Sequence, residues 1–178
     1  VPGGWVADKL FGAQKSVLIG AIIITLGHYV LAMPFEKTFF LGLVLVSIGT
    51  GFLKPNISTI VGQLYKPGDI RIDAGYTIFY MSINIGSMLG FLVCGYLGEK
   101  VGWHYGFGAA GVGMTFGVIQ YIWTRKSLGE AGLKPNLEVN EDASRYKSFF
   151  YIAMTLLVLI IGTNFLGLWS IDAQVLNQ

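Results

Sequence analysis

Charged residues are scarce in this sequence. Lys, Arg, Asp and Glu make up only 12% of the 178 residues, whereas 53% are hydrophobic and the mean hydropathy is +0.62. Such a composition is outside the usual range of water-soluble domains, so we expect a membrane protein in contact with a lipid bilayer. The net charge of +2 is too small, and the basic residues are too scattered, to suggest a nucleic-acid partner.

Cysteine and histidine are almost absent. The single cysteine, Cys94, excludes an internal disulfide and a cysteine metal site, and its apolar neighbours favour a packed side chain. His28 and His104 lack the paired spacing of a zinc site and have no visible nucleophile partner. We therefore predict no metal and no cofactor, and we do not expect an enzyme. The start of the chain shows no signal-peptide pattern, and both chain ends are interpreted as edges of a fragment.

Long stretches without charge indicate membrane helices. Four such stretches have nearly the length that crosses a bilayer as helix: 16–33, 74–98, 103–124 and 148–170. A fifth, 39–65, matches them except for Lys54. We therefore predict an all-α membrane protein with about five membrane helices. The polar segment 125–147 is too long for a tight turn and is expected to divide two bundles.

The basic residues predict the orientation. Counting loops alternately places nine on one side: Lys9, Lys15, Lys66, Arg71, Arg125, Lys126, Lys134, Arg145 and Lys147. Only Lys37 and Lys100 fall on the other side. Because cytoplasmic loops collect positive charge, the linker and the loop 66–71 are predicted to be cytoplasmic, in a multi-pass protein of the inner (plasma) membrane.

Small residues recur at four-residue spacing in two of the predicted helices. Gly86 and Gly90 lie in one, and Ala109, Gly113 and Gly117 lie in another. Small side chains let helices approach closely in lipid, so these positions are predicted to be helix-packing sites.

Lys54 is a cation inside a predicted membrane span. It lies about 16 Å from the nearer end of that span at 1.5 Å per residue, and a central lysine costs on the order of 3 kcal/mol to insert. Such a residue normally faces a cavity or a partner; a structural ion pair or a neutral buried lysine is the alternative. Pro55 follows it directly and is predicted to kink or open the helix, either as a moving part or as a static bend.

Polar residues accompany Lys54 at helical spacing. Ser47, Thr50, Lys54 and Ser58 share one helix face, and Tyr76, Tyr80, Asn84 and Ser87 share a face of the next helix. If the two faces meet, they would line a wet cavity. Interhelical hydrogen bonding is the alternative for either stripe alone.

Three motifs resemble those of known transporters. GGWVADKLFGAQK, residues 3–15, resembles the loop between the second and third helices of major facilitator transporters. GTGFLKPNISTIVGQLY, residues 49–65, and FYMSINIGS, residues 79–87, resemble the two signatures of the bacterial proton-dependent oligopeptide transporter family. The resemblance implies part of a twelve-helix (6+6) fold. Residues 1–126 would hold the end of helix 2 to helix 6, residues 127–147 a cytoplasmic linker, and residues 148–178 an additional inter-bundle helix or the start of helix 7.

The resemblance also implies a function, which is proton-coupled import of di- and tripeptides by alternating access, with protons as the coupling ion. By it, Lys54, Tyr80 and Asn84 bind peptide, and Lys54 also takes part in proton coupling. Conformational switching would involve Asp8, Gly12, Lys15 and Pro55. The remainder of the same transporter chain is an expected partner. Two alternatives remain: a transporter for another small anion such as nitrate, and a non-transporting membrane sensor or scaffold.

Overall fold

The computed structural model describes residues 11–133 and three positions of the last segment, 148, 152 and 155. The chain divides into two compact units, Val1–Glu141 and Asp142–Gln178, and the described elements all lie in the first. They are helices, with no strand among them.

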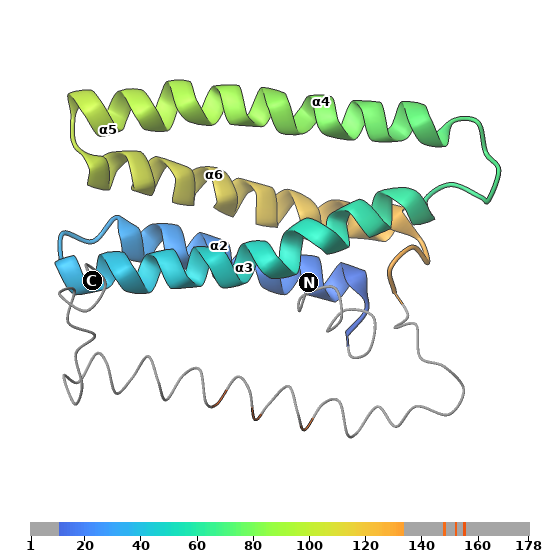
Figure 1. The fold of residues 1–178 in the computed structure, drawn as a ribbon, viewed down its shortest axis with the longest axis horizontal. Coiled ribbons are helices and arrows are strands. Elements are labelled where there is room, and N and C mark those ends of the chain that lie inside the picture. Colours follow the sequence, from blue (N-terminus) through green and yellow to red (C-terminus); the bar gives the residue numbers. More distant parts are fainter. Residues whose placement is uncertain (1–10, 134–147, 149–151, 153–154, 156–178) are drawn as a thin grey trace, which may run out of the picture. The chain divides into compact units, whose positions relative to one another are not determined.

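The described part of this unit forms four long helical rods, and successive rods run in opposite directions (Figure 1). The third rod is continuous through three elements, because α4 passes into a π-helical turn, η2, and then into α5. The elements are α2 (Ala13–Leu31), α3 (Glu36–Gln63), α4 (Ile72–Gly90), η2 (Phe91–Gly95), α5 (Tyr96–Lys100), α6 (Trp103–Thr124) and the 3₁₀ turn η3 (Arg125–Leu128).

The rods coincide with four of the five predicted membrane spans. Within residues 11–133, three segments are long and apolar enough to cross a membrane: Ala13–Leu31, Thr38–Gln63 and Ile72–Lys100. The fourth rod, α6, has 22 residues but is rich in glycine and tyrosine, which lower its hydropathy. The fifth predicted span, 148–170, lies almost wholly outside the described residues.

The tightest helix packing joins α2 and α3. A Cβ added at Gly20 would lie 2.7 Å from the Gly49 carbonyl oxygen, and a Cβ at Gly42 would lie 3.0 Å from the Gly27 carbonyl oxygen. No real side chain tolerates the first of these distances. The two backbones therefore approach closely because glycine occupies both sides of the crossing, as small residues allow in membrane helices.

The glycines predicted to mediate packing do not do so in the described part of the chain. A Cβ at Gly86, Gly90, Gly113 or Gly117 would meet no atom within 4 Å. The four-residue spacing marks positions where a helix can approach, but it does not say which helix supplies the partner. The close approaches within this unit fall on other glycines.

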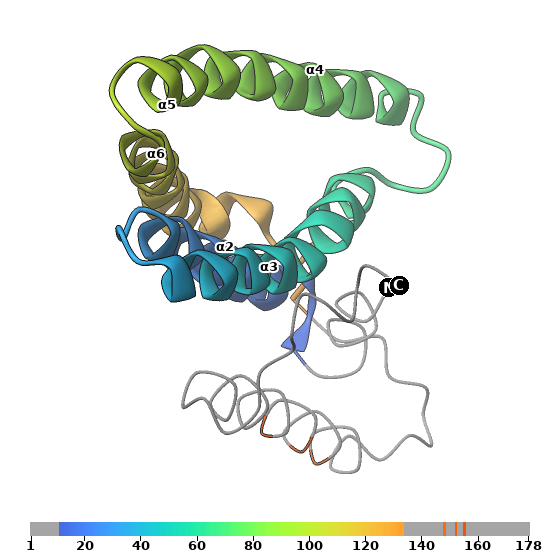
Figure 2. The same cartoon turned by 60° about the vertical axis from the view of Figure 1, so that its left-hand side comes forward.

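The α4 rod has few neighbours among the described residues. It contains no buried residue, and large apolar side chains such as Ile78 and Met88 are more than half exposed. Figure 2 shows α4 set apart from α2 and α3, with the α5 end nearest to α6. Its apolar surface suits lipid or further protein rather than water.

Pro55 lies inside α3, which continues as helix on both sides of it. In both ribbon views α3 changes direction part-way along its length (Figures 1 and 2), as expected for a helix with an internal proline. The hydroxyls after the proline bond back to the helix: Thr59 Oγ1 donates to the Pro55 carbonyl at 3.0 Å and Ser58 Oγ to the Lys54 carbonyl at 3.3 Å.

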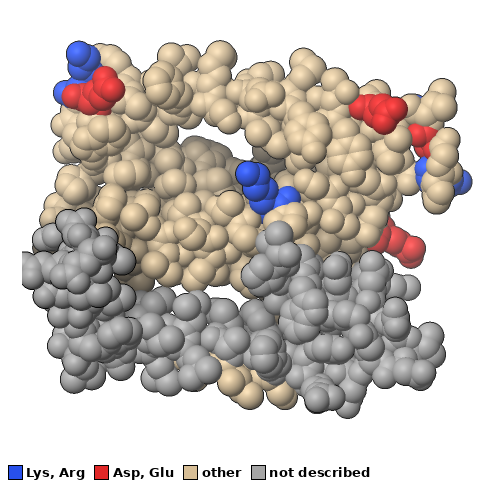
Figure 3. Space-filling view, in the orientation of Figure 1, with Lys and Arg blue, Asp and Glu red and all other residues tan. Residues whose placement is uncertain are grey.

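Charged side chains gather at the ends of the rods. Figure 3 shows a face that is apolar or uncharged between its ends, except for one basic group in its middle, beside a hollow. Five described basic residues belong to the end where α3 meets α4: Lys15, Lys66, Arg71, Arg125 and Lys126. Lys100 lies at the opposite end.

A candidate binding site along α3 and α4

Lys54 is the described basic residue that lies deep inside a membrane-length helix. It precedes Gln63, the last residue of α3, by nine positions, or about 14 Å along the axis. Its side chain is exposed in this chain, and no described residue bonds or ion-pairs with its ammonium group. The opposite face of α3 is the packed one, where Phe52, Asn56 and Ile60 are buried. Lys54 therefore points away from the α2–α3 contact.

One hydrogen bond joins the helices that carry the two polar stripes. Tyr76 Oη, from α4, donates a hydrogen bond to the Ser58 carbonyl oxygen of α3 at 3.2 Å. Ser58 is one turn beyond Lys54, to whose carbonyl its hydroxyl also bonds. The Tyr76 ring stacks on that of Tyr80, with centroids 6.3 Å apart. The contact places the Lys54 face of α3 toward the tyrosine face of α4.

This contact fixes the relative depth of the remaining residues. Helices α3 and α4 are antiparallel. Residues that precede Ser58 in α3 and residues that follow Tyr76 in α4 therefore lie on the same side of the Ser58–Tyr76 contact. Lys54 and Tyr80 are each one turn from it, and Asn84 is two turns from it. Lys54, Tyr80 and Asn84 therefore lie on the same side of the Ser58–Tyr76 contact. No direct contact joins them among the described residues, and a shared binding space stays a prediction.

Tyr80 and Asn84 are available to a ligand. Tyr80 is 55% exposed, and Asn84 is exposed. An amide can both donate and accept, a phenol can do the same, and an ammonium can only donate. The three groups together can hold a carboxylate and a peptide group, which is the chemistry predicted from the sequence.

Asn56 is a polar residue that the sequence argument did not single out. It is only 2% exposed, and its Nδ2 donates to the Phe52 carbonyl at 2.6 Å. Its position two residues after Lys54 puts it on the opposite side of α3, because two residues rotate about 200°. The two-residue offset from Lys54 can be read from the sequence, and it indicates that Asn56 has a packing role.

The predicted switch residues lie partly within the described range. Asp8 is outside it. Gly12 directly precedes α2 with φ 79° and ψ 157°, and Lys15, in the first turn of α2, is exposed. The structure explains why position 12 is a glycine: a Cβ there would lie 2.7 Å from the Leu133 carbonyl oxygen. Only glycine fits this conformation and this contact.

An ion pair fixes the turn between α3 and α4. Arg71 Nη2 lies 2.8 Å from Asp69 Oδ2, and the hydrogen bonds from the Arg71 side chain and backbone lower the pKa of Asp69 to about 2. The carboxylate therefore stays charged at any pH near neutrality.

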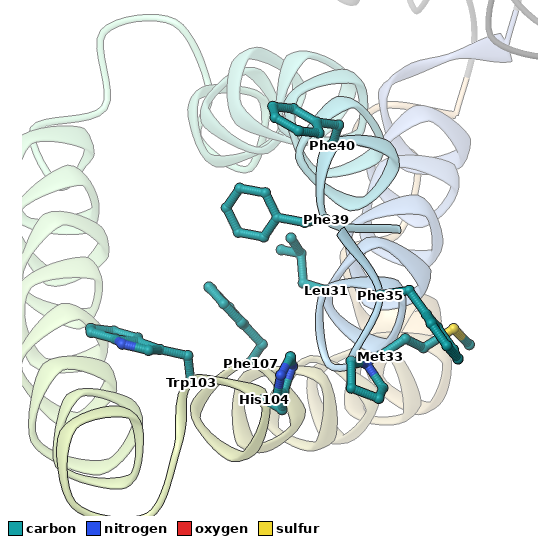
Figure 4. A pocket seen from close by; sticks show the side chains of 9 residues that line it. Leu31, Met33, Phe35, Phe39, Phe40, Trp103, His104 and Phe107 are labelled. Atoms are coloured by element: carbon teal, nitrogen blue, oxygen red, sulfur yellow. The ribbon is translucent and has the colours of Figure 1, made fainter. Parts of the chain in front are cut away.

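An aromatic cavity of about 640 Å³ opens at the other end of the rods. Figure 4 shows Phe39, Phe107 and Trp103 directed into the same space, with His104 at its edge. Met33 and Pro34 complete the wall near the α2–α3 turn. The lining is almost wholly apolar, and the cavity lies away from Lys54, so it is not part of the predicted site.

His28 and Cys94 line a smaller cavity of about 240 Å³. His28 Nδ1 is buried without a hydrogen-bond partner among the described residues, and Cys94 is a free, partly buried cysteine. The described residues contain no group of three or more metal-ligating side chains. Both residues face α6 across this cavity, and Cys94 is partly packed, as predicted.

Comparison with known proteins decides the family. A sequence model of the POT family matches residues 14–155. The chain belongs to the POT family. The matched region includes the Lys54 segment as well as the segment that carries Tyr80 and Asn84. The predicted resemblance and the fold class, an all-α membrane protein of the major facilitator type, are thereby confirmed.

Relatives of the POT family cover nearly the whole chain. A di-/tripeptide transporter of Lactococcus lactis subsp. lactis (strain IL1403) is 41% identical over 172 residues, which are 96% of this chain and 34% of that protein. The crystal structure of peptide transporter POT in complex with sulfate gives a TM-score of 0.81 at 40% identity, covering 95% of this chain and 35% of that one. A POT family transporter in complex with a thioalcohol conjugated peptide gives 0.77 at 36% identity, covering 97% and 36%. This chain thus spans about a third of the length of these relatives.

Proposed function

We propose that the transporter containing this chain imports di- and tripeptides together with protons by alternating access. Family membership supports transport, and the relative named as a di-/tripeptide transporter supports peptides as the substrate. The observation that carries the proposal is the Ser58–Tyr76 hydrogen bond, which sets Lys54 at the depth of Tyr80 on neighbouring polar faces. A cation deep within a membrane-length helix, beside hydroxyl and amide groups, suits a zwitterionic peptide.

Each residue has a distinct role in this proposal. The Lys54 ammonium pairs with the peptide carboxylate, a charge-assisted contact that is stronger than a neutral hydrogen bond. Asn84 donates to and accepts from the peptide group, and Tyr80 supplies a hydroxyl and an aromatic wall. Recognition of the main chain leaves the peptide side chains free to vary.

Proton coupling follows from alternate pairing of Lys54. An acidic side chain from the rest of the transporter pairs with the ammonium when no peptide is bound, and the peptide carboxylate displaces it. Since the two partners favour different conformations, peptide and proton bias the same equilibrium, which is the requirement for coupling. Pro55 makes α3 compliant where this exchange occurs.

The protein is proposed to span the inner (plasma) membrane with the more basic end of its rods in the cytoplasm. Five described basic residues at the α3–α4 end support this orientation, because cytoplasmic loops collect Lys and Arg. Loop 66–71 and the linker 127–147 then face the cytoplasm.

A transporter of another small anion such as nitrate is the second candidate, because a single cation within a membrane-length helix does not by itself require a peptide. Purified full-length protein in sealed vesicles, with an imposed inward proton gradient, separates the two. We expect labelled dipeptide and tripeptide to accumulate and nitrate not to compete. Accumulation of nitrate alone supports the second candidate, and ligand binding without any accumulation supports a non-transporting sensor or scaffold.

A further inference from the structure

The five residues after η3 are bound tightly to two other helix ends. We call residues 129–133 the strap. The backbone N–H of Gln14, at the start of α2, donates to the Gly132 carbonyl at 3.0 Å. Gln14 Nε2 donates to the Ala131 carbonyl at 2.7 Å and to the Gly129 carbonyl at 3.4 Å. The strap is thus held by one residue of α2 through three hydrogen bonds.

The end of α3 holds the strap from the other side. The backbone N–H of Gly132 donates to Gln63 Oε1 at 2.7 Å. Tyr121, near the end of α6, adds a bond from its hydroxyl to the Gln14 carbonyl at 3.1 Å. The ends of α2, α3 and α6 therefore meet at the strap.

Two glycines with positive φ make this contact possible. Gly12 has φ 79° and Gly132 has φ 73°. A Cβ at Gly12 would strike the Leu133 and Gly132 carbonyl oxygens, and a Cβ at Gly132 would come within 3.2 Å of Ile60 Cγ1, Ala13 Cβ and the Gln14 nitrogen. The strap thus lies against the α2 terminus with no room for side chains between them.

An apolar cluster lies under the strap. Ala13, Val17 and Ile60 are buried there, and Leu128 and Ala131 pack against them. The Gln14 side chain is only 7% exposed. Because a buried amide that loses its partners pays a desolvation cost, the strap and Gln14 hold each other in place.

The strap connects three parts of the chain that the proposed function involves. Gln14 lies within the segment 3–15, two residues after Gly12. Gln63 ends the helix that carries Lys54. The strap itself leads from α6 into the predicted inter-bundle linker.

We propose that the strap joins the switch loop, the Lys54 helix and the linker into one moving unit, with Gln14 and Gln63 as its positioning residues. This inference rests on the proposed transport function. Neither residue touches the substrate in this account: each acts by keeping the linker attached to the helix ends, so that movement of the linker is transmitted to α3 and to the 3–15 loop.

Gln63 accepts a hydrogen bond from the strap, whereas the Gln14 side chain donates to it. Position 63 therefore offers a matched pair of variants, one that keeps the bond and one that removes it. Gln63 acts as an acceptor, so Gln63→Glu keeps the bond to the Gly132 N–H, whereas Gln63→Met removes it at similar size. Gln63 is exposed, so neither change threatens folding. Gln14 acts as a donor, so Gln14→Met is the second variant that releases the strap.

Hydrogen exchange read by mass spectrometry on the full-length transporter measures the attachment directly. We expect Gln63→Met and Gln14→Met to raise exchange in peptides covering 129–133 by roughly five-fold or more, and Gln63→Glu to leave it unchanged. Unchanged exchange in Gln63→Met, or equal exchange in Gln63→Met and Gln63→Glu, overturns the strap.

Peptide uptake and peptide affinity test the coupling. We expect Gln63→Met to lower the maximal uptake rate several-fold with an unchanged peptide Kd, and Gln63→Glu to restore the rate. A normal rate in Gln63→Met with a released strap overturns the coupling role. If the wild-type protein moves no peptide, the proposed function fails, and the exchange comparison still decides whether the strap exists.

Discussion

Replacing Gly12 with alanine is the perturbation whose cost the structure defines best. Gly12 has φ 79° and ψ 157°, a backbone region that is essentially restricted to glycine and costs other residues about 1–3 kcal/mol. The added Cβ would also lie 2.7 Å and 2.8 Å from two carbonyl oxygens of the strap. Both atoms belong to the backbone and cannot rotate away. We therefore expect Gly12→Ala to cost at least about 2 kcal/mol of stability.

Two other glycines separate the backbone cost of the Gly12→Ala change from the cost of its steric clash. Gly68 has φ 82°, but a Cβ there would meet nothing within 4 Å, so Gly68→Ala carries the backbone cost alone, about 1 kcal/mol. Gly51 is helical and equally open, so Gly51→Ala should stabilise by about 0.5–1 kcal/mol. Thermal unfolding of the three full-length variants should rank Gly51→Ala highest and Gly12→Ala lowest. The reasoning is refuted if Gly12→Ala unfolds at or above the temperature of Gly68→Ala.

Three further predictions concern the site and the orientation. Asn84→Ala should weaken peptide binding by about 1–3 kcal/mol, since a buried partner loses its hydrogen bond; wild-type affinity by calorimetry contradicts that assignment. Tyr76→Phe, which removes the bond to the Ser58 carbonyl, should cost about 0.5–1.5 kcal/mol of thermal stability; an unchanged unfolding temperature would show that this contact does not hold α4 against α3. Cysteines placed at Lys37 and Lys66 in a Cys94→Ser background should react with impermeant reagent from opposite sides only, and equal labelling rules out the proposed topology.

The helices could be predicted from the sequence because charge is so rare in it. The predicted span 16–33 corresponds to Ala13–Leu31, and 103–124 has the same bounds as α6. The interrupted stretch 39–65 is one helix in spite of Lys54 and Pro55. Apolar stretches report lipid exposure directly, so their limits follow from composition alone.

Packing partners could not be predicted in the same way. Spacing identified Gly86 and Gly113 as contact positions, whereas the close approaches occur at Gly20 and Gly49. Glycine spacing indicates where another helix can approach the backbone. Which helix approaches depends on the tertiary fold. At Gly86 no described atom lies within 4 Å of the position of a Cβ.

Only the helix faces of the candidate site could be predicted from helical periodicity, and its binding role stays a prediction. The faces of Lys54 and of Tyr80 with Asn84 follow from spacings of three and four residues. Their common depth does not, because it depends on the Ser58–Tyr76 contact between two helices. The strap was missed for the same reason: Gln14 and Gln63 have no distinctive spacing, and only the fold brings both to Gly132.

The central claim is that Lys54 exchanges partners between the peptide and an acidic side chain. Its most direct test is proton-driven uptake of a labelled dipeptide by full-length Lys54→Ala protein in sealed vesicles. We expect uphill accumulation to be abolished in this variant while the protein stays folded in the membrane. We also expect Lys54→Arg to restore little, because the guanidinium is larger and keeps its proton. Uphill accumulation by Lys54→Ala at the wild-type rate would contradict the account.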